Sequence, residues 1–316
     1  MTILITGAAG FIGSHVAEAY LNQGKSVIGL DNLNDFYDPE IKKENISQLK
    51  KYDMFKFVEG DILDENVIDE LFSKTKISLL VHLAAMAGVR PSISQSSYYT
   101  DVNIKGTVNL LEACKKYQVK KILFASSSSV YGNNKKVPFS EEDVVDYPVS
   151  PYAATKKAGE LICHTYSHLY DLSIACLRFF TVYGPKQRPE MAIHLFTDAI
   201  QKGRPISVFN EGHCLRDYTY IDDIVQGMLS IAKNDFKFDV INLGESETIS
   251  TLDMIRLIEK ELGKKAQLNL LPAQPGDVDQ TFADISRAKQ IYDYQPKVSI
   301  QDGIKRFVAW YLAKLE

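Results

Sequence analysis

The sequence is poor in several features that would place it in a specialised class of protein. Its four cysteines, Cys114, Cys163, Cys176 and Cys214, are widely spaced and form no Cys-x-x-Cys pair, so we expect neither a zinc knuckle nor a disulfide framework. The 36 Lys+Arg and 40 Asp+Glu give a net charge of −4, without the basic excess that a phosphate-backbone binder needs. No nucleic-acid partner is therefore expected.

Long apolar runs and metal-ligand patterns are also missing. No apolar run reaches the roughly 20 residues that a membrane helix requires, and the N-terminal MTILITGAAG lacks the basic start and long apolar stretch of a signal peptide. His164 and His168 are spaced as i and i+4, but no Glu-x-x-His pattern or third ligand accompanies them, so helix-surface histidines are expected. We predict a cytoplasmic protein with no membrane association and no metal.

The hydrophobic pattern predicts an α/β protein of two domains. Short apolar runs alternate with stretches of helical length, which is typical of βαβ units and a parallel sheet. The predicted strands are Thr2 to Thr6, Ser26 to Leu30, Phe55 to Val58, Leu79 to Leu83, Lys121 to Ser126 and Ser173 to Leu177. Beyond about Phe180, loops rich in Gly and Pro change the rhythm. We predict a Rossmann-type doubly wound parallel sheet in residues 1–180 and a smaller C-terminal α/β substrate domain in 181–316, some segments of which return to the first domain.

A glycine-rich turn follows the first predicted strand. Gly7, Gly10 and Gly13 allow a tight turn and close backbone approach, so a pyrophosphate can bind at the N-terminus of the next helix. Their spacing differs by one from Gly-x-Gly-x-x-Gly, and the motif alone is weak. Asp31 ends the second strand, where a carboxylate hydrogen-bonds ribose hydroxyls and repels a 2′-phosphate. The context favours a dinucleotide site over the alternative interpretation, a plain glycine turn beside a solvated aspartate. Within such a site, it favours NAD over NADP.

One of four Tyr-x-x-x-Lys pairs stands at the start of a predicted helix. Only Tyr152 and Lys156 follow a helix-start signature, in which Ser150 is the N-cap and Pro151 the first helical residue. The two side chains share a helix face. Because a free phenol has a pKa of about 10, its use as a base requires that pKa to be lowered by Lys156, by an oxidised nicotinamide and by the helix N-terminus. Four serines, residues 126–129, follow an apolar strand at its carboxyl end, where parallel sheets bind their ligands. A serine hydroxyl there can relay a proton between the substrate and Tyr152.

Together these motifs resemble the extended short-chain dehydrogenase/reductase superfamily, within its nucleotide-sugar epimerase and dehydratase branch. The resemblance runs nearly from end to end and implies a tightly held NAD, with Ser127, Tyr152 and Lys156 as catalytic residues. In such enzymes the tyrosine takes the 4-hydroxyl proton while C4 gives hydride to the nicotinamide, the 4-keto sugar rotates, and hydride returns to its other face. The implied cofactor contacts are Gly7, Gly10, Phe11, Ile12, Gly13, Asp31, Asn32, Asp61, Ile62, Leu83, Ala84, Ala85, Asn103, Ser126, Tyr152 and Lys156.

Within that branch, the residues after Ser127 discriminate between activities. The 4,6-dehydratases carry an Asp-Glu pair where Ser128 and Ser129 stand, and uronate decarboxylases carry a glutamate at Ser129. The UDP-glucuronate 4-epimerases resemble this sequence most closely, through the serine run, residues 34–39 and a Phe-Thr-Val-Tyr-Gly-Pro segment that contains Thr181. Ser128, Ser129 and Thr181 would hold a uronate carboxylate out of line with the C4 keto group, which prevents loss of CO2. The plainer interpretation is a wet pocket lined by small polar residues.

By family position, Arg188 and Arg216 are candidates for the UDP phosphates, Arg90 is a weaker one, and Asp277 keeps part of a nucleotide-contact segment. Ser127 would also touch the substrate. UDP-glucose and UDP-N-acetylglucosamine stay open as substrates, as do a UDP-glucuronate decarboxylase and a non-catalytic NAD-binding protein. The resemblance further implies a homodimer formed through the stretches Val102 to Tyr117 and Tyr152 to Tyr170.

Overall fold

A seven-stranded sheet is the largest sheet in the computed structural model, which describes residues 1–272 and 280–315. Its order is β11-β6-β5-β4-β1-β2-β3, and the pairs formed among β1 to β5 are parallel. The strands are β1 (Thr2–Thr6), β2 (Ser26–Asp31), β3 (Phe55–Glu59), β4 (Ile77–His82), β5 (Lys121–Ser127), β6 (Ser173–Phe179) and β11 (Phe238–Leu243). The predicted doubly wound α/β fold is confirmed.

Residue contacts divide the chain into two units. The first comprises Met1–Asn133, Asp143–Arg178 and Met228–Ile241, and the second comprises Asn134–Glu142, Phe179–Gly227 and Asn242–Glu316. Residues 134–142 belong to the second unit, although no feature of the sequence pattern predicts this assignment. The roles assigned to the two domains, NAD binding and sugar-nucleotide binding, stay predictions.

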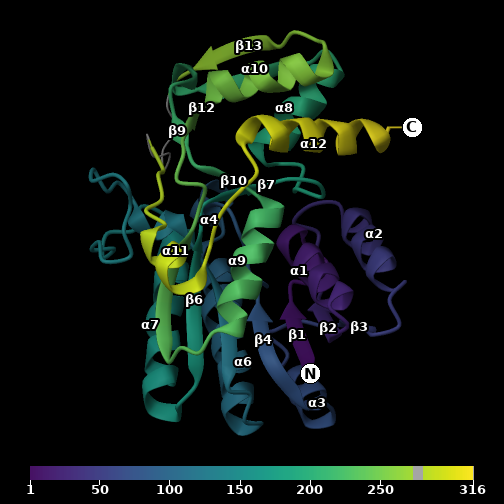
Figure 1. Cartoon of the computed structure of the whole chain (residues 1–316), viewed down its shortest axis with the longest axis vertical. Helices are drawn as coiled ribbons and strands as arrows, with labels where there is room; N and C mark the ends of the chain where they lie inside the picture. The colour runs from purple at the N-terminus through teal and green to yellow at the C-terminus, as the bar shows by residue number, and fades with distance from the viewer. Residues whose placement is uncertain (273–279, 316) are drawn as a thin grey trace. The chain divides into compact units, whose positions relative to one another are not determined.

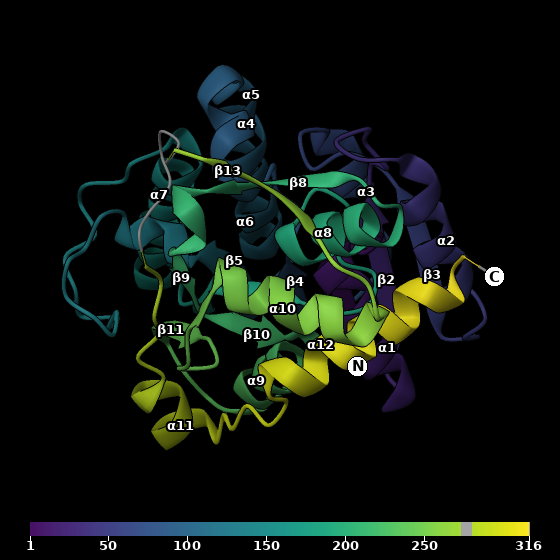
Figure 2. The ribbon, with the colours of Figure 1, turned by 90° about the horizontal axis from the view of Figure 1, so that it is seen from above.

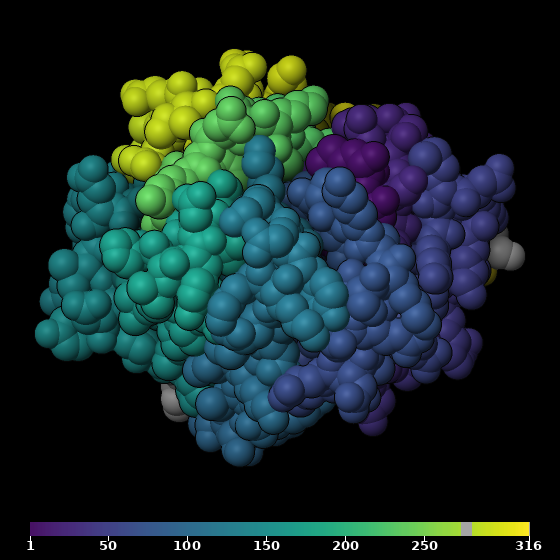
Figure 3. All heavy atoms as spheres, turned by 90° about the horizontal axis from the view of Figure 1, so that it is seen from below, coloured from purple at the N-terminus to yellow at the C-terminus, as the bar shows by residue number. Residues whose placement is uncertain are grey.

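Helices cover the sheet of the first unit and share its apolar core (Figures 1 and 2). They are α1 (Phe11–Asn22), α2 (Pro39–Leu49), α3 (Glu65–Lys74), α4 (Val89–Ser94), α5 (Ser96–Thr100), α6 (Gly106–Lys116) and α7 (Pro151–Tyr170). Leu80, Ile122 and Phe124 of the strands pack with Leu110 of α6 and Cys163 of α7 in one buried cluster. In the space-filling view of Figure 3, the blue segments that include α3 and α6 lie side by side, in agreement with the contacts between these helices.

The second unit combines helices with short strand pairs. Its helices are α8 (Ala192–Gln201), α10 (Thr251–Leu262), α11 (Ser286–Tyr292) and α12 (Ile300–Ala313), and α9 (Ile221–Lys233) begins in it and continues into the first unit. The strand pairs are β7 (Thr181–Tyr183) with β10 (Tyr218–Tyr220), β8 (Pro205–Phe209) with β13 (Gln267–Leu271), and β9 (Leu215–Arg216) with β12 (Ile249–Ser250). Helix α10 contacts α8 and α12.

Within the described ranges 1–272 and 280–315, no helix is long and apolar enough to span a membrane. No group of three or more His, Cys, Asp or Glu side chains there is arranged to hold a metal ion. The four cysteines are buried free thiols.

Candidate active site

The turn between β1 and α1 has the close backbone packing that the glycine pattern predicts. Gly7 has a positive φ of 71°, and its amide donates to Leu30 O at 2.8 Å. A Cβ on Gly13 would overlap the carbonyl oxygen of Gly7, so a larger residue would displace the turn. The first intrahelical bond runs from Ser14 N to Gly10 O, and the amides of residues 11, 12 and 13 precede it. This cradle fits the pyrophosphate of a dinucleotide.

Asp31 lies at the carboxyl end of β2, beside that turn. Its Oδ2 accepts a hydrogen bond from Ala9 N at 3.0 Å, and its Oδ1 accepts one from Leu33 N at 2.9 Å. Burial raises the pKa of Asp31, and the two backbone donors oppose that rise. Each oxygen keeps a second lone pair that a ribose hydroxyl can use. Asp61 accepts from the Asn32 side chain at 2.8 Å, so these three predicted cofactor residues are brought together in the first unit.

A chain of hydrogen bonds runs through buried His82 at the end of β4. The Thr107 hydroxyl donates its single proton to Asn103 O at 2.6 Å, so it accepts from His82 Nε2 at 3.0 Å. His82 Nδ1 must then accept from the Thr6 hydroxyl at 2.8 Å, whose oxygen accepts from Ala84 N at 3.2 Å. Burial lowers the pKa of His82 to about 3, which keeps it neutral in this role. These hydrogen bonds thus fix the position of the loop that follows β4, at Ala84.

Asn103 holds the same loop from the opposite end. Its Oδ1 accepts from Met86 N at 2.8 Å, and its Nδ2 donates to Met86 O at 2.9 Å and to Thr155 Oγ1 at 3.0 Å. Both amide hydrogens are used, so any contact of this side chain with NAD would be through its oxygen. The residue lies in a π-helical turn, Asp101–Lys105, a feature that often marks functional sites. Sequence reasoning missed the connection to α7.

The remaining predicted cofactor residues surround this loop. Leu83 N donates to Thr6 O at 3.2 Å, which continues the β1–β4 pairing by one residue. A Cβ on Gly7 would come within 2.8 Å of Ala84 N, so the loop and the glycine turn are in direct contact. Ile62 is buried and lies under Gly106 of α6. Ala85 is half-buried and lies between Ala84 and Met86, the residue that Asn103 holds by two hydrogen bonds.

Helix α7 carries Tyr152 and Lys156 on one face, as its spacing predicts. Ser150 Oγ accepts from Ala153 N at 3.1 Å and caps the helix, with Pro151 in the first turn. The Lys156 ammonium lies 5.9 Å from the centre of the Tyr152 ring and donates to Ala125 O at 2.7 Å. Burial lowers the pKa of Lys156 to about 8. The ammonium form therefore still predominates at neutral pH.

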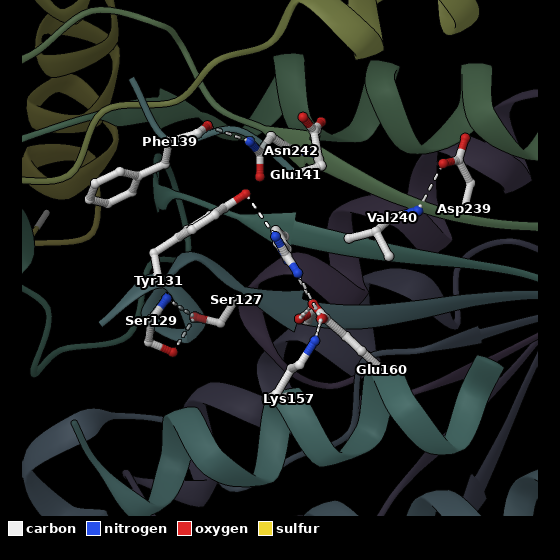
Figure 4. Close-up of polar contacts among 12 residues, drawn as sticks. Ser127, Ser129, Tyr131, Phe139, Glu141, Lys157, Glu160, Asp239, Val240 and Asn242 are labelled. Carbon is white, nitrogen blue, oxygen red and sulfur yellow. Dashed lines mark hydrogen bonds and ion pairs between the residues drawn. The ribbon is translucent and has the colours of Figure 1, made fainter. Parts of the chain in front are cut away.

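The serine run at the end of β5 has two distinct environments. Ser126 is buried, and its hydroxyl donates to Glu160 Oε1 at 2.6 Å, so a contact with NAD would involve its backbone. Ser127 Oγ accepts from Ser129 N at 3.2 Å and from Ser129 Oγ at 2.9 Å (Figure 4). Ser128 and Ser129 begin a 3-10 turn and are half-buried. The Ser127 hydroxyl proton stays available for donation.

Three other predicted substrate residues, Thr181, Arg188 and Arg216, lie in the second unit. Thr181 starts β7, and its amide donates to Asp217 O at 3.1 Å. Arg188 pairs with Glu190 at 3.2 Å, and Arg216 Nη1 donates to the carbonyl of the preceding residue at 3.0 Å. Arg90 belongs to the first unit and lies in α4. Asp277 falls outside the described residues.

A buried carboxylate organises the loops around Arg216. Asp217 is fully buried, and its carboxylate accepts from Glu245 N at 2.8 Å, Ser246 N at 3.1 Å and Ala283 N at 3.1 Å. Burial raises its pKa to about 6, against the effect of these donors. Asp217 thus acts as a structural acceptor that joins three segments far apart in the sequence.

The sheet, the glycine turn, the acidic end of β2 and the Tyr-Lys helix define a short-chain dehydrogenase/reductase of the extended type. The family model described as GDP-mannose 4,6 dehydratase matches residues 4–307, and the chain belongs to this family. The predicted family resemblance, including the nucleotide-sugar epimerase branch, is confirmed.

Three named proteins illustrate the similarity. The chain is 46% identical to a UDP-glucuronate 4-epimerase of Thermodesulfobacterium geofontis over 99% of this chain and 97% of the relative. A Bacillus cereus UDP-glucuronic acid 4-epimerase, solved with UDP-glucuronic acid and NAD, is 39% identical, with a TM-score of 0.93 over 100% of both chains. A Thermotoga maritima UDP-glucose 4-epimerase, solved with UDP-glucose, is 33% identical, with the same TM-score of 0.93 over 100% of both chains. The fold alone therefore does not select the sugar.

Proposed function

We propose that this protein is an NAD-dependent UDP-glucuronate 4-epimerase. It oxidises C4 of the sugar to a 4-keto intermediate, lets that intermediate rotate, and reduces it from the other face. The full-length similarity to named UDP-glucuronate 4-epimerases supports the substrate, and the predicted enzyme class and cofactor agree with these relatives. The observation that carries the chemistry is the buried Lys156 ammonium 5.9 Å from the Tyr152 ring.

Tyr152 is the base in this proposal. Its phenol takes the proton of the 4-hydroxyl, and the positive charge of Lys156 stabilises the phenolate that takes part. The Lys156 ammonium is held in place by its bond to Ala125 O at 2.7 Å. Ser127 donates a hydrogen bond to the reacting oxygen and relays the proton. NAD, when bound, accepts the hydride of C4 and returns it.

The polar residues around the sugar have separate proposed roles. Ser128, Ser129 and Thr181 hydrogen-bond the C6 carboxylate and keep it out of line with the keto group, which suppresses loss of CO2. Arg188 and Arg216 bind the phosphates, and Arg90 is a further phosphate donor. UDP-glucuronate is preferred over the uncharged UDP-hexoses because three hydroxyl side chains are available for its carboxylate.

We further propose a homodimer formed through α6 and α7. On α7, Leu161 and Leu169 have exposed fractions of 57% and 59%, and their spacing of eight residues places them on one face of the helix. Leu161→Asp should convert the protein to a monomer in sedimentation velocity, whereas Leu195→Asp on α8, where the leucine is 49% exposed, should not. An unchanged sedimentation coefficient for Leu161→Asp would contradict this interface. A cytoplasmic location stays a prediction.

A proton NMR time course with UDP-glucuronate and a catalytic amount of NAD tests the function. Signals of UDP-galacturonate should grow to a plateau. If UDP-glucuronate stays unchanged while UDP-glucose or UDP-N-acetylglucosamine is epimerised, the carboxylate hypothesis is wrong.

Thr181→Ala tests the carboxylate contact separately. The variant should epimerise more slowly and release more CO2, while Thr181→Ser, which keeps the hydroxyl, should behave like the wild type. Unchanged epimerisation with no gain of decarboxylation in Thr181→Ala would remove this residue from the proposal.

A further inference from the structure

A buried ion pair lies next to Ser126, the residue before Ser127, and Figure 4 labels its carboxylate, Glu160. Arg178 of β6 donates from Nε to Glu160 Oε1 at 2.8 Å and from Nη2 to Oε2 at 2.9 Å, with both side chains 3% exposed. Ser126 adds a third donor to the same carboxylate at 2.6 Å, and Lys157 lies 3.8 Å from it. This two-point fork fixes both distance and orientation between α7 and β6.

The same arginine also contacts Tyr131, the last residue of the turn that follows Ser127 (the serine turn, Ser128–Tyr131). Its Nη1 donates to the Tyr131 hydroxyl at 2.9 Å, and its guanidinium carbon lies 4.8 Å from the centre of the Tyr131 ring. Tyr131 is 3% exposed and is the last residue of the 3-10 turn Ser128–Tyr131. Arg178 therefore holds Tyr131 directly and Ser126 through Glu160. The residues between these two anchors are Ser127, Ser128, Ser129 and the buried Val130.

Two further contacts set the position of α7 along β5. Lys156 donates to Ala125 O, and Gly159 packs so closely on the Phe124 ring that a Cβ there would overlap it. Together with the bond from Ser126 to Glu160, these contacts join three successive residues of β5 to α7. The helix that carries Tyr152 thus cannot shift along the strand without breaking several contacts.

We propose that Tyr131, Arg178 and Glu160 are positioning residues that hold the turn of residues 127–129 against α7. The inference rests on the proposed function, because it assigns the turn two tasks: presenting Ser127 for proton relay and presenting Ser128 and Ser129 to the sugar carboxylate. A displacement of about 1 Å in such a group lowers the rate by up to about a hundredfold. The Tyr131 hydroxyl is the one member that can be removed without leaving a buried charge unpaired.

If the serine turn is displaced, the ratio of decarboxylated to epimerised product should change as well as the rate of epimerisation. After C4 is oxidised, a misplaced carboxylate leaves as CO2. The C5–C6 bond breaks, its electron pair moves into the keto group as an enolate, and C5 then takes a proton. The two electrons removed from C4 stay on the nicotinamide, so reduced cofactor accumulates in step with the CO2 released. The ratio of decarboxylated to epimerised product does not depend on how much enzyme is folded.

Tyr131→Phe is the test, with Ser167→Ala as its control. Ser167 also lies on α7 and is buried, and its hydroxyl donates to Lys237 O at 3.1 Å, away from the serine turn. We expect Tyr131→Phe to lower kcat about tenfold, to leave KM within about twofold, and to raise the fraction of decarboxylated product about fivefold. Amides of the turn should exchange hydrogen faster. Ser167→Ala should match the wild type in product ratio and in exchange at the turn.

A wild-type product ratio, kcat and exchange rate in Tyr131→Phe would overturn the inference, as would an equal change in Ser167→Ala. Arg178→Lys is a second variant that keeps the charge but loses the fork, and it should shift the product ratio in the same direction. If the wild type does not epimerise UDP-glucuronate, the proposed function fails. The positioning role is then judged by the exchange rates and by kcat on the UDP-sugar that is turned over.

Discussion

Replacing Lys156 by methionine removes a buried charge while keeping a side chain of similar length. The pKa of Lys156 is lowered to about 8 by burial, against about 10.4 for a solvated lysine, a difference that corresponds to about 3 kcal/mol at neutral pH. The variant also loses the hydrogen bond to Ala125 O at 2.7 Å, which costs about 1–3 kcal/mol. We therefore expect Lys156→Met to be as stable as the wild type at pH 7 or more stable by about 1–2 kcal/mol.

The pH dependence separates this explanation from others. The unfolded chain keeps the lysine proton up to about pH 10.4, whereas the folded chain loses it near pH 8. Between these values the unfolded state binds more protons, so the stability of the wild type rises by about 1.4 kcal/mol per pH unit relative to the variant. Any advantage of Lys156→Met should therefore be constant below pH 8 and should shrink toward pH 10.

Urea titrations of both proteins from pH 7 to pH 10, followed by circular dichroism, measure this difference. Epimerase assays on the same samples should show a loss of at least about a hundredfold, because Tyr152 no longer has a neighbouring cation to lower its pKa. A stability difference that is flat across the whole pH range would contradict this prediction. Such a result would mean that the pKa of Lys156 is not depressed by the fold.

Two further predictions concern the cofactor region. Gly13→Ala should weaken NAD binding at least about tenfold by calorimetry, because its methyl group would overlap Gly7 O. At Gly24 an added methyl group meets open space but the φ of 68° strains an alanine, so Gly24→Ala should lose some stability and still bind NAD normally. Because burial lowers the pKa of His82 to about 3, the folded state does not take the proton that the unfolded state binds below about pH 6.5. Wild-type stability should fall relative to His82→Gln by about 1.4 kcal/mol per pH unit from pH 6.5 downward, and parallel urea profiles at pH 7 and pH 5 would contradict this.

Much of the first unit could be predicted from local pattern. Each predicted strand overlaps a strand of the parallel sheet, and Ser150 caps the helix that carries Tyr152. These features depend on apolar periodicity, glycine conformation and capping, which act within a few residues of the chain. The family resemblance added Asn103 and Ser126 as cofactor contacts, whereas their side chains bond Thr155 and Glu160.

The order of strands and helices, the glycine turn, and the shared face of Tyr152 and Lys156 could all be predicted from local patterns in the sequence, because each depends on neighbours in the chain. The contacts of Thr6 with His82, 76 residues away, and of Arg178 with Tyr131, 47 residues away, were found only in the folded chain. Such pairs carry no local signal, since a threonine, histidine or arginine in a strand looks the same whatever it contacts. Their partners are chosen by strand order and burial, which require every polar group removed from water to find a hydrogen bond.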